Sequence, residues 1–553
     1  MIKLRQNYVP AVILLALLIF FVYFFNIWNY DLWSPDEPRY AEVARETAVE
    51  GNWVIPHLNN RVYYEKPPVF YNIIALTGLI NGEFSAAAVR FPVIITAVLL
   101  IAFFTYYTIT KIDFYTGLLS GIILATTGQF FWLAMRVNLD IPLVFCTTIS
   151  ALIFFHHIDS FYSYKWRTLI AFFLMGLGAV IKSPISLLPL LVVIIYAFLN
   201  KKTKKLKEIP WISAFVVMLI PAAVWLYLAY NKAGFSYIQI TVLDQLIGYS
   251  TGSQGHPQPF YYYLLNFPVL ALPWSIFLIP AIYYYNKFKI KVPNLVRFSM
   301  LWFVMVFIIF SLVGSKRGVY LLQLYPAFSI IIAWFFKLHF DGTIRKKYSL
   351  VIPVLILGIL FAVLGGYIFF NGEMLIQEEL DFNLNENPDY YNLYQGLYLF
   401  FTVTGILFFL SAAVRNKRFV FYITVLFSLV LIILLKSLFL PAVNEVKSER
   451  YLAEDLAEAY NKNVEVGLWG SLNNDSGFVF YNGIYYDYIF DDPESGKEFL
   501  ERPGKQILIV NEADKLLNNL SENEYRDFEI KKYRVGSDDM LLLIEKELME
   551  GLN

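Results

Sequence analysis

The sequence from Leu32 to Pro68 reads LWSPDEPRYAEVARETAVEGNWVIPHLNNRVYYEKPP and follows the first long apolar stretch of the chain. It combines two adjacent carboxylates, Asp36 and Glu37, with several basic and aromatic side chains. Packing among membrane helices gives no reason to concentrate charged groups in this way, because charge is costly near hydrocarbon. We therefore interpret this stretch as an outer loop that forms the first half of an active site at the lipid-water boundary.

The composition around this loop is that of a membrane protein. Of the 553 residues, 58% are hydrophobic and only 16% are charged, and the mean hydropathy is +0.54. Apolar stretches of about 20 residues, long enough to cross ~30 Å of hydrocarbon as a helix, recur from Tyr8 to Phe439. We count roughly thirteen. The first, Tyr8 to Trp28, lacks a small-residue cleavage site, so we expect a retained helix rather than a signal peptide.

The basic residues predict how the chain is oriented in the membrane. With a cytoplasmic N-terminus and thirteen helices, four basic loops fall on the cytoplasmic side, as the positive-inside rule requires. They are KKTKKLK (201–207), NKFKIK (286–291), RKK (345–347) and RNKR (415–418). The cations left on the outer side need another explanation and are Arg39, Arg45, Arg61, Lys66, Arg90, Arg136, Lys182, Lys232, Lys316, Arg317 and Lys436.

The composition changes after residue 442. Residues 443–553 contain 24 acidic and 12 basic side chains, so a net charge of about −12 balances about +12 on the preceding part. Four segments predict strands (VEVGLWG, GIYYDYIF, KQILIV and DMLLLIEK), and two predict helices (ESGKEFLE and EADKLLNNL). We expect a transmembrane domain at 1–442, with an outer-face loop at 29–86, followed by a soluble periplasmic α/β domain at 443–553. A solvated cover for the outer face is the simplest role for that domain.

The outer loop predicts a short amphipathic helix from Arg39 to Glu50, lying in the interface. Pro38 suits its first turn and Gly51 suits its C-terminal end. Asp36 or Glu37 could be a helix cap, which would explain one carboxylate without any chemistry. A cap does not explain the rest of the loop, in which YYEKPP brings a second acid-base pair back to the next span.

Further polar residues interrupt the later apolar stretches on the same predicted side. In AMRVNLDIPL, a structural ion pair between Arg136 and Asp140 is an alternative to a functional role. Other cations and aromatic groups lie in GAVIKSPISLLP, GSKRGVYLLQLYP and TGSQGHPQPFYYYL, and the residues that we single out there are Lys182, Lys316, Arg317, Tyr320 and His256.

Taken together, these residues suggest one kind of chemistry. A lipid-linked phosphate needs cations to hold its charge and an apolar surface for its tail. A carboxylate can act as a general base. Transfer of a sugar from a polyprenyl phosphate meets both requirements, because the departing phosphate is stabilised by positive charge.

The same motifs carry a family resemblance. The order PDEPRYAEVARE, GNWVIPHLN, YYEKPP, VNLDIPL, IKSPIS, HPQPFYYY and SKRGVYLLQLYP resembles that of the bacterial 4-amino-4-deoxy-L-arabinose lipid A transferases. More broadly, the chain is similar to the protein O-mannosyltransferase-like membrane glycosyltransferases of the GT-C fold. The likeness is specific in the first 150 residues, moderate to Pro326 and weak beyond residue 442.

The resemblance implies roles for individual residues. It makes Asp36 and Asp140 the catalytic acids. It implies substrate or donor-phosphate contacts from Arg39, Tyr40, Tyr63, Lys66, Lys182, Lys316, Arg317 and Tyr320. A metal bound in relatives makes Glu65 and His256 candidate ligands of a divalent ion such as zinc, although two protein ligands alone do not complete a zinc site.

Two departures from the family pattern put the acceptor in doubt. In SKRG, Arg and Gly follow SK, where relatives more usually have an apolar or small residue and Pro, and Gln323 stands where relatives often have Pro. A hydroxyl acceptor needs a base, whereas a phosphate acceptor, as on lipid A, is already ionised. The resemblance implies a multi-pass protein of the bacterial inner membrane with a periplasmic site. Its expected partners are a polyprenyl-phosphate sugar, lipid A or another envelope acceptor, and membrane lipids, with no nucleic acid.

A lipid-linked sugar transporter or flippase is the alternative from another class of function. Such proteins are also polytopic and contain intramembrane charges. Transporters commonly contain internal repeats and place polar residues near the membrane midplane. Here we find no repeat, and the polar residues gather at one predicted face, which favours the enzyme.

Overall fold

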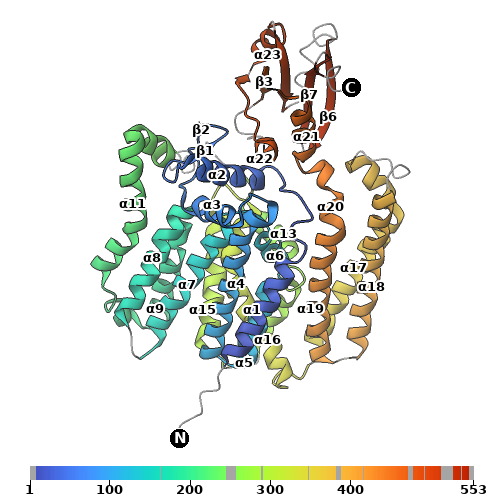
Figure 1. The fold of residues 1–553 in the computed structure, drawn as a ribbon. Helices are drawn as coiled ribbons and strands as arrows, with labels where there is room; N and C mark the ends of the chain where they lie inside the picture. The colour runs from blue at the N-terminus through green and yellow to red at the C-terminus, as the bar shows by residue number, and fades with distance from the viewer. Residues whose placement is uncertain are drawn as a thin grey trace. The chain divides into compact units, whose positions relative to one another are not determined.

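The structure is a computed structural model of the chain, drawn as a ribbon in Figure 1. It describes residues 8–161, 164–244, 257–287, 291–346, 348–380, 388–414, 416–461, 463–470, 477–490, 492–502, 504–511, 527–536, 538–546 and 548. The chain divides into two compact units, each built from segments that alternate along the sequence. Unit 1 comprises Met1–Phe25, Tyr64–Phe70 and Phe91–Leu435, and unit 2 comprises Asn26–Tyr63, Tyr71–Arg90 and Lys436–Asn553.

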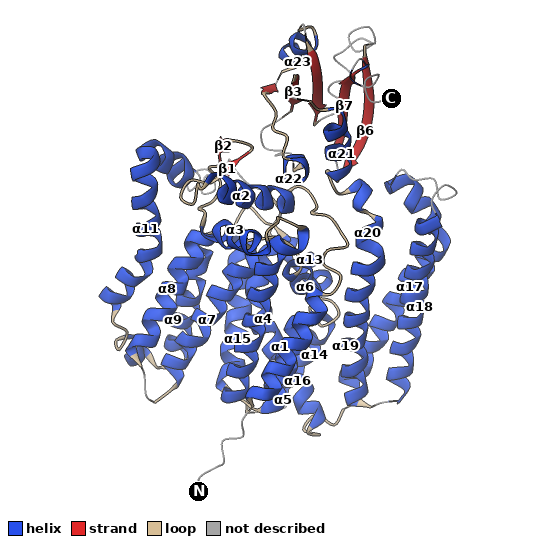
Figure 2. Cartoon of the chain, in the orientation of Figure 1, coloured by secondary structure: helices blue, strands red, loops and turns tan. Residues whose placement is uncertain are grey.

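Most of the chain is helical (Figure 2). The described helices up to residue 439, other than α2 (Asp36–Glu50), are α1 (Val9–Phe24), α3 (Val69–Asn81), α4 (Ala86–Lys111), α5 (Phe114–Thr126), α6 (Gly128–Ala134), α7 (Asp140–Asp159), α8 (Lys165–Ile181), η1 (Pro184–Leu187), α9 (Leu188–Leu199), α10 (Thr203–Leu206), α11 (Trp211–Ile238), η2 (Gln239–Asp244), α13 (Tyr262–Leu270), η3 (Ser275–Phe277), α14 (Leu278–Lys287), α15 (Asn294–Leu312), η4 (Gly318–Leu324), α16 (Tyr325–Phe340), α17 (Tyr348–Leu380), α18 (Pro388–Val414), α19 (Lys417–Leu434) and η5 (Leu435–Phe439).

Among the described residues, eight helices are long and apolar enough to cross a membrane, or ten if each of two bent pairs forms one span. Three shorter apolar helices accompany them, at Val9–Phe24, Val69–Asn81 and Pro184–Leu199. The chain is therefore a multi-span helical membrane protein. The expected total of thirteen spans stays a prediction.

The two bent pairs meet at their breaks. The α5–α6 pair bends by 68° and the pair formed by α13 with η3 and α14 bends by 112°. The amide of Gly128, at the first break, donates to the carbonyl of Leu272, at the second, over 2.9 Å. The indole of Trp274 donates to the Thr126 hydroxyl at 3.0 Å. A side chain at position 128 would approach Leu272 O to 3.1 Å, so glycine suits this close approach.

Unit 2 holds the first outer loop and the C-terminal region. Its elements are α2 (Asp36–Glu50), β1 (His57–Leu58), β2 (Arg61–Val62), most of α3, α20 (Leu440–Ala442), η6 (Asn444–Val446), α21 (Arg450–Ala459), β3 (Val464–Trp469), α22 (Phe478–Asn482), β4 (Tyr488–Phe490), α23 (Pro493–Leu500), β5 (Lys505–Val510), β6 (Phe528–Val535) and β7 (Asp538–Glu545). Strands β1 and β2 form an antiparallel hairpin, and β3 to β7 form one sheet.

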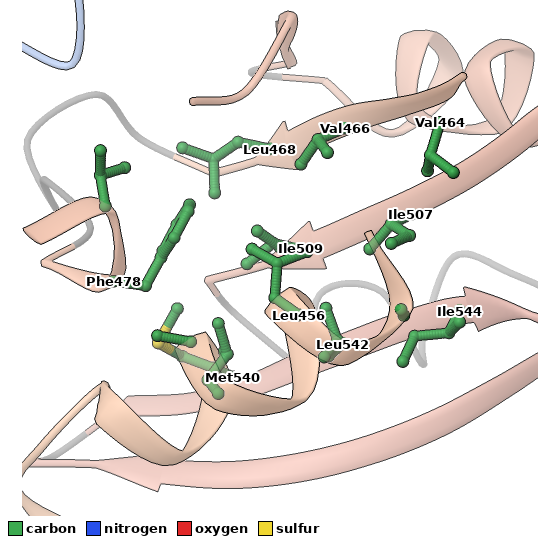
Figure 3. Close-up of a cluster of buried hydrophobic side chains, with 14 of the residues drawn as sticks. Leu456, Val464, Val466, Leu468, Phe478, Ile507, Ile509, Met540, Leu542 and Ile544 are labelled. Atoms are coloured by element: carbon green, nitrogen blue, oxygen red, sulfur yellow. The ribbon is translucent and has the colours of Figure 1, made fainter. Parts of the chain in front are cut away.

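The five strands lie in the order β4-β3-β5-β7-β6. Strand β3 pairs in parallel with β4 and β5, while β7 is antiparallel to both β5 and β6. Figure 3 shows one face of the sheet, where apolar side chains of β3, β5 and β7 meet Leu456 of α21 and Phe478 of α22. Phe499 of α23 packs in a second buried cluster with Trp469 and Leu508. Helices thus contribute to both apolar clusters of a mixed α/β region.

Several local predictions are confirmed and others need correction. The four predicted strands occur as β3, β4, β5 and β7, and ESGKEFLE forms α23, whereas EADKLLNNL lies outside the described residues. Prediction missed α21, α22 and β6. The outer-loop helix begins at Asp36 rather than Arg39, and neither Asp36 nor Glu37 caps it, because its N-cap residue is Pro35. Gly51 ends it in the left-handed conformation (φ 73°), as expected.

Candidate active site

The two adjacent carboxylates of α2 have different surroundings. Glu37 is 1% exposed and forms a bidentate ion pair with Arg90, at 2.9 and 3.0 Å. It also accepts the backbone N–H of Trp33 at 3.2 Å. The Asp36 side chain is 35% exposed and accepts a hydrogen bond from Arg39 at 2.7 Å. Glu37 is therefore a buried structural anion, whereas the Asp36 carboxylate is partly exposed to solvent.

Arg90 explains why Glu37 is held so firmly. Its guanidinium also donates to the carbonyls of Ile27, Tyr30 and Asp31 at 3.1, 2.9 and 2.6 Å. Together with the two bonds to Glu37, these use all five N–H groups of the side chain. In the sequence, Arg90 is recognisable only as a cation on the unexpected side of the membrane. The structure shows that it fixes the chain leading into α2.

Aromatic residues that the sequence singled out lie beside Asp36 and Arg39 within unit 2. The Arg39 guanidinium lies 5.3 Å from the centre of the Tyr40 ring. Tyr40 and Tyr63 both contact the ring of Tyr71, with centroids 5.6 and 6.1 Å apart. The four predicted residues of this loop (Asp36, Arg39, Tyr40 and Tyr63) thus form one connected group through Tyr71, which sequence analysis did not identify.

In unit 1, Asp140 pairs with Lys182 rather than with Arg136. The Lys182 ammonium lies 2.6 Å from the Asp140 carboxylate. Asp140 is the first residue of α7, and Lys182 follows the last residue of α8, so each charge faces the favourable end of a helix dipole. The Arg136 guanidinium lies over the ring of Trp132, 5.1 Å from its centre. The ion pair between Arg136 and Asp140, which was the structural alternative to a functional role, does not form, whereas two predicted site residues, Asp140 and Lys182, are in contact.

The start of α7 is fixed by its neighbours. The side-chain oxygen of Asn138 accepts the amides of Asp140 and Ile141, both at 3.0 Å. Further along α7, the Thr147 hydroxyl donates to Gln323 of η4 at 2.6 Å. Gln323, which departs from the family pattern, therefore links the helix that begins with Asp140 to the segment after Lys316 and Arg317.

The two adjacent cations of the SKRG motif have different environments. Lys316 is 3% exposed and donates to the carbonyl of Gln258 at 2.8 Å. Arg317 is exposed, and its carbonyl accepts the hydroxyl of Tyr263 at 3.2 Å. Tyr320 lies in η4, with its ring 5.9 Å from that of Phe310. Lys316 fastens a loop in this structure, so Arg317 is the more accessible of the two for an anionic ligand.

The residues of a metal site are only partly described. Glu65 and Lys66 lie half-buried in the loop before α3, and His256 lies outside the described residues. No three His, Cys, Asp or Glu side chains within the described ranges could together hold a metal ion. The described residues alone therefore do not complete a metal site.

A cluster that prediction missed lies on the buried face of α2. Arg45 donates to both oxygens of Glu42 at 2.7 and 2.6 Å, and also to the hydroxyl of Tyr485 at 3.0 Å. Glu46 is fully buried and accepts the backbone amide of Asn60 at 3.2 Å. Burial, and then the adjacent Glu42 carboxylate, raise the pKa of Glu46 to about 8. The raised pKa favours the protonated form of the Glu46 carboxyl near neutral pH.

The raised pKa of Glu46 predicts that the stability of the folded protein changes with pH. The folded protein retains a proton that the unfolded chain, with an ordinary glutamate pKa near 4.5, has lost. The stabilisation that comes from this retained proton is complete below about pH 4.5 and is lost as the pH rises through about 8. We expect Glu46→Gln to flatten the fall in thermal midpoint between pH 5 and 8. An unchanged slope in that variant would mean that Glu46 is ionised throughout.

Comparison with known proteins places these residues in a wider context. The family model for dolichyl-phosphate-mannose-protein mannosyltransferase matches residues 65–228. An undecaprenyl phosphate-alpha-4-amino-4-deoxy-L-arabinose arabinosyl transferase of Pectobacterium atrosepticum is 29% identical over 341 residues, 60% of this chain and 59% of its own length. A second transferase of that name, from Proteus mirabilis, is 27% identical over 352 residues, 60% of each chain. The chain thus spans about three fifths of these curated relatives.

The fold is shared over nearly the whole chain. The crystal structure of ArnT from Cupriavidus metallidurans bound to undecaprenyl phosphate superposes with a TM-score of 0.74 at 16% identity, covering 98% of this chain and 99% of the other. The resemblance predicted from the motifs is confirmed, and so is the GT-C fold.

Proposed function

We propose that this chain, which has the fold of a transferase solved with undecaprenyl phosphate, is a membrane glycosyltransferase. It would move a sugar from a polyprenyl phosphate to an acceptor of the bacterial envelope. The names of its relatives favour 4-amino-4-deoxy-L-arabinose as the sugar and lipid A as the acceptor. The observation that carries the proposal is the accessible carboxylate of Asp36 beside a fully satisfied Glu37.

The proposed reaction is a single displacement. An acceptor oxygen attacks the anomeric carbon of the sugar, the bond from that carbon to the phosphate oxygen breaks, and polyprenyl phosphate leaves with the electron pair. If the acceptor is a hydroxyl, Asp36 or Asp140 removes its proton. If it is a phosphate, no base is needed, and the carboxylates orient the sugar. Cations at Lys66, Lys182 and Arg317 would stabilise the departing phosphate. The fourth predicted cation, Lys316, would instead hold the loop through the carbonyl of Gln258.

A second candidate is transfer to a protein hydroxyl. The match to the mannosyltransferase family model favours it, because that model covers the segment with Lys66, Asp140 and Lys182. Both candidates use a lipid-linked donor, so the acceptor distinguishes them. Purified full-length protein in nanodiscs should be incubated with undecaprenyl-phosphate-linked aminoarabinose or mannose and with lipid A or a serine-rich peptide, and products identified by mass spectrometry. Absence of any polyprenyl phosphate release would reject both.

Lys182 provides a test of the donor-phosphate assignment. We expect Lys182→Ala to weaken binding of undecaprenyl phosphate by about 1.5–3 kcal/mol, the range for a hydrogen bond to a charged group. Lys202 is a matched control, since it pairs with Asp159 at the other end of α7 over the same 2.6 Å. Lys202→Ala should leave the dissociation constant unchanged. Equal weakening in both variants would show a loss of helix packing instead of a lost ligand contact.

The proposal also includes the localisation of the chain. We place it in the bacterial inner membrane with thirteen spans, and with Asp36 and residues 443–553 in the periplasm. Single cysteines at positions 204 and 498, both exposed, would test it in a background in which the buried Cys146 is replaced by alanine. We expect a membrane-impermeant thiol reagent, added to cells with a permeable outer membrane, to label position 498 only. Labelling of position 204 alone would reverse the orientation.

A further inference from the structure

The segment Asp31–Pro35, here called the leader segment, connects the first span to α2 and is bound by side chains from the C-terminal region. The Asn444 side-chain oxygen accepts the backbone amide of Asp31 and the indole N–H of Trp33, both at 3.1 Å. The Tyr481 hydroxyl accepts the amide of Leu32 at 2.9 Å and donates to its carbonyl at 3.0 Å. Two side chains thus satisfy four polar groups within three consecutive residues.

Glu449 makes a third connection at the end of the leader segment. One of its oxygens accepts the hydroxyl of Ser34, and the other accepts the backbone amide of Phe478 at 2.8 Å. The side chain is buried, so both bonds form away from bulk water, where a carboxylate that lost its donors would be costly. Glu449 therefore joins the residue two positions before Asp36 to the first turn of α22.

The contact between α22 and α2 is also closely fitted. Gly477 precedes α22, and a side chain there would lie 2.4 Å from the Cβ atom of Pro38. Only glycine leaves room for this approach. Three kinds of contact therefore lie within a few residues of Asp36: hydrogen bonds to the backbone, a buried carboxylate and close packing. A domain that simply covers a surface needs none of them.

We propose that the C-terminal α/β region positions the catalytic acid, with Glu449, Asn444 and Tyr481 as positioning residues that act through the leader segment. This inference rests on the proposed function, in which Asp36 touches the substrate. Catalytic rates depend steeply on geometry, and a displacement of about 1 Å can cost roughly a hundredfold. The region would then be needed for turnover without itself contacting the donor.

The test compares three variants of the full-length protein. Glu449→Ala removes both hydrogen bonds, and we expect kcat to fall roughly ten- to a hundredfold with KM for the lipid-linked sugar within about twofold. Glu449→Gln can keep both bonds, because its oxygen accepts from Phe478 and its amide donates to Ser34, so it should restore most of kcat. Glu454→Gln removes an exposed carboxylate from α21 and should behave as wild type.

Hydrogen exchange gives a readout that does not depend on activity. The backbone amides of residues 31–34, 36 and 37 should exchange faster in Glu449→Ala than in wild type or in Glu449→Gln. If Glu449→Ala does not fold, Ser34→Ala removes a single bond of the same pair and should give a smaller fall in kcat. If the amides exchange faster in Glu449→Ala but the wild-type protein shows no turnover, the proposed function is rejected. The attachment of the leader segment by Glu449 would still stand. Unchanged exchange and kcat in Glu449→Ala, or equal loss in Glu449→Gln, would overturn the positioning role.

Discussion

Replacing Asp36 with asparagine is expected to lower the rate of sugar transfer at least about a hundredfold while leaving the protein folded. The substitution keeps the size of the side chain and one oxygen that can accept from Arg39, but removes the charge. The Glu37 carboxylate already accepts hydrogen bonds from Arg90 and from the Trp33 amide, so no adjacent carboxylate can replace Asp36. The measurement is release of polyprenyl phosphate by purified protein, with size-exclusion chromatography as a check on folding.

The size of the loss also distinguishes the acceptor classes. A general base for a hydroxyl acceptor contributes roughly 10²- to 10⁴-fold, whereas a carboxylate that only orients the sugar stays near the lower end. Glu50→Gln is a suitable control, since Glu50 is an exposed carboxylate at the other end of α2. Near-normal activity in Asp36→Asn would remove Asp36 from the mechanism, and equal loss in Glu50→Gln would attribute the effect to the charge of the helix.

The features that the sequence predicted well are those encoded locally. Short, mostly apolar runs predict β3 and β5, because side chains on both faces of the sheet are buried when helices cover both sides. Gly51 predicts the end of α2 because it adopts a conformation that other residues avoid. Strand β6 was missed because only its two terminal residues are buried, so its polar interior lacks an apolar pattern.

Contacts between distant residues could not be predicted in the same way. Asp36 and Glu37 are neighbours in sequence, and the difference between them arises from Arg90, which is 53 residues from Glu37 along the chain. Glu449 is 415 residues from Ser34. Lys316 appears in sequence as another outer cation, but its ammonium is bound to a carbonyl 58 residues away. Residue type and spacing identified the charges, whereas their partners depend on tertiary structure.

Arg90→Ala is expected to cause the largest loss of stability of any single substitution considered for this chain. The side chain is fully buried, and its removal leaves the Glu37 carboxylate without its cation and three carbonyls without a donor. Removing one partner of a buried ion pair costs about 3–5 kcal/mol. Arg90→Lys should recover only part of this loss, because a lysine has three donors and lacks the planar fork that pairs with a carboxylate.

Native-state hydrogen exchange of the α2 amides measures this loss, since these amides report on opening of the segment that Arg90 holds. Lys532→Ala is the matched control, because Lys532 forms an exposed pair with Asp539, of a kind worth about 0–1 kcal/mol. The double variant Arg90→Met with Glu37→Met should be more stable than the sum of the single losses predicts, since it leaves no unpaired buried charge. Strictly additive losses would show that Arg90 and Glu37 contribute independently, and that the division of roles between Glu37 and Asp36 has another origin.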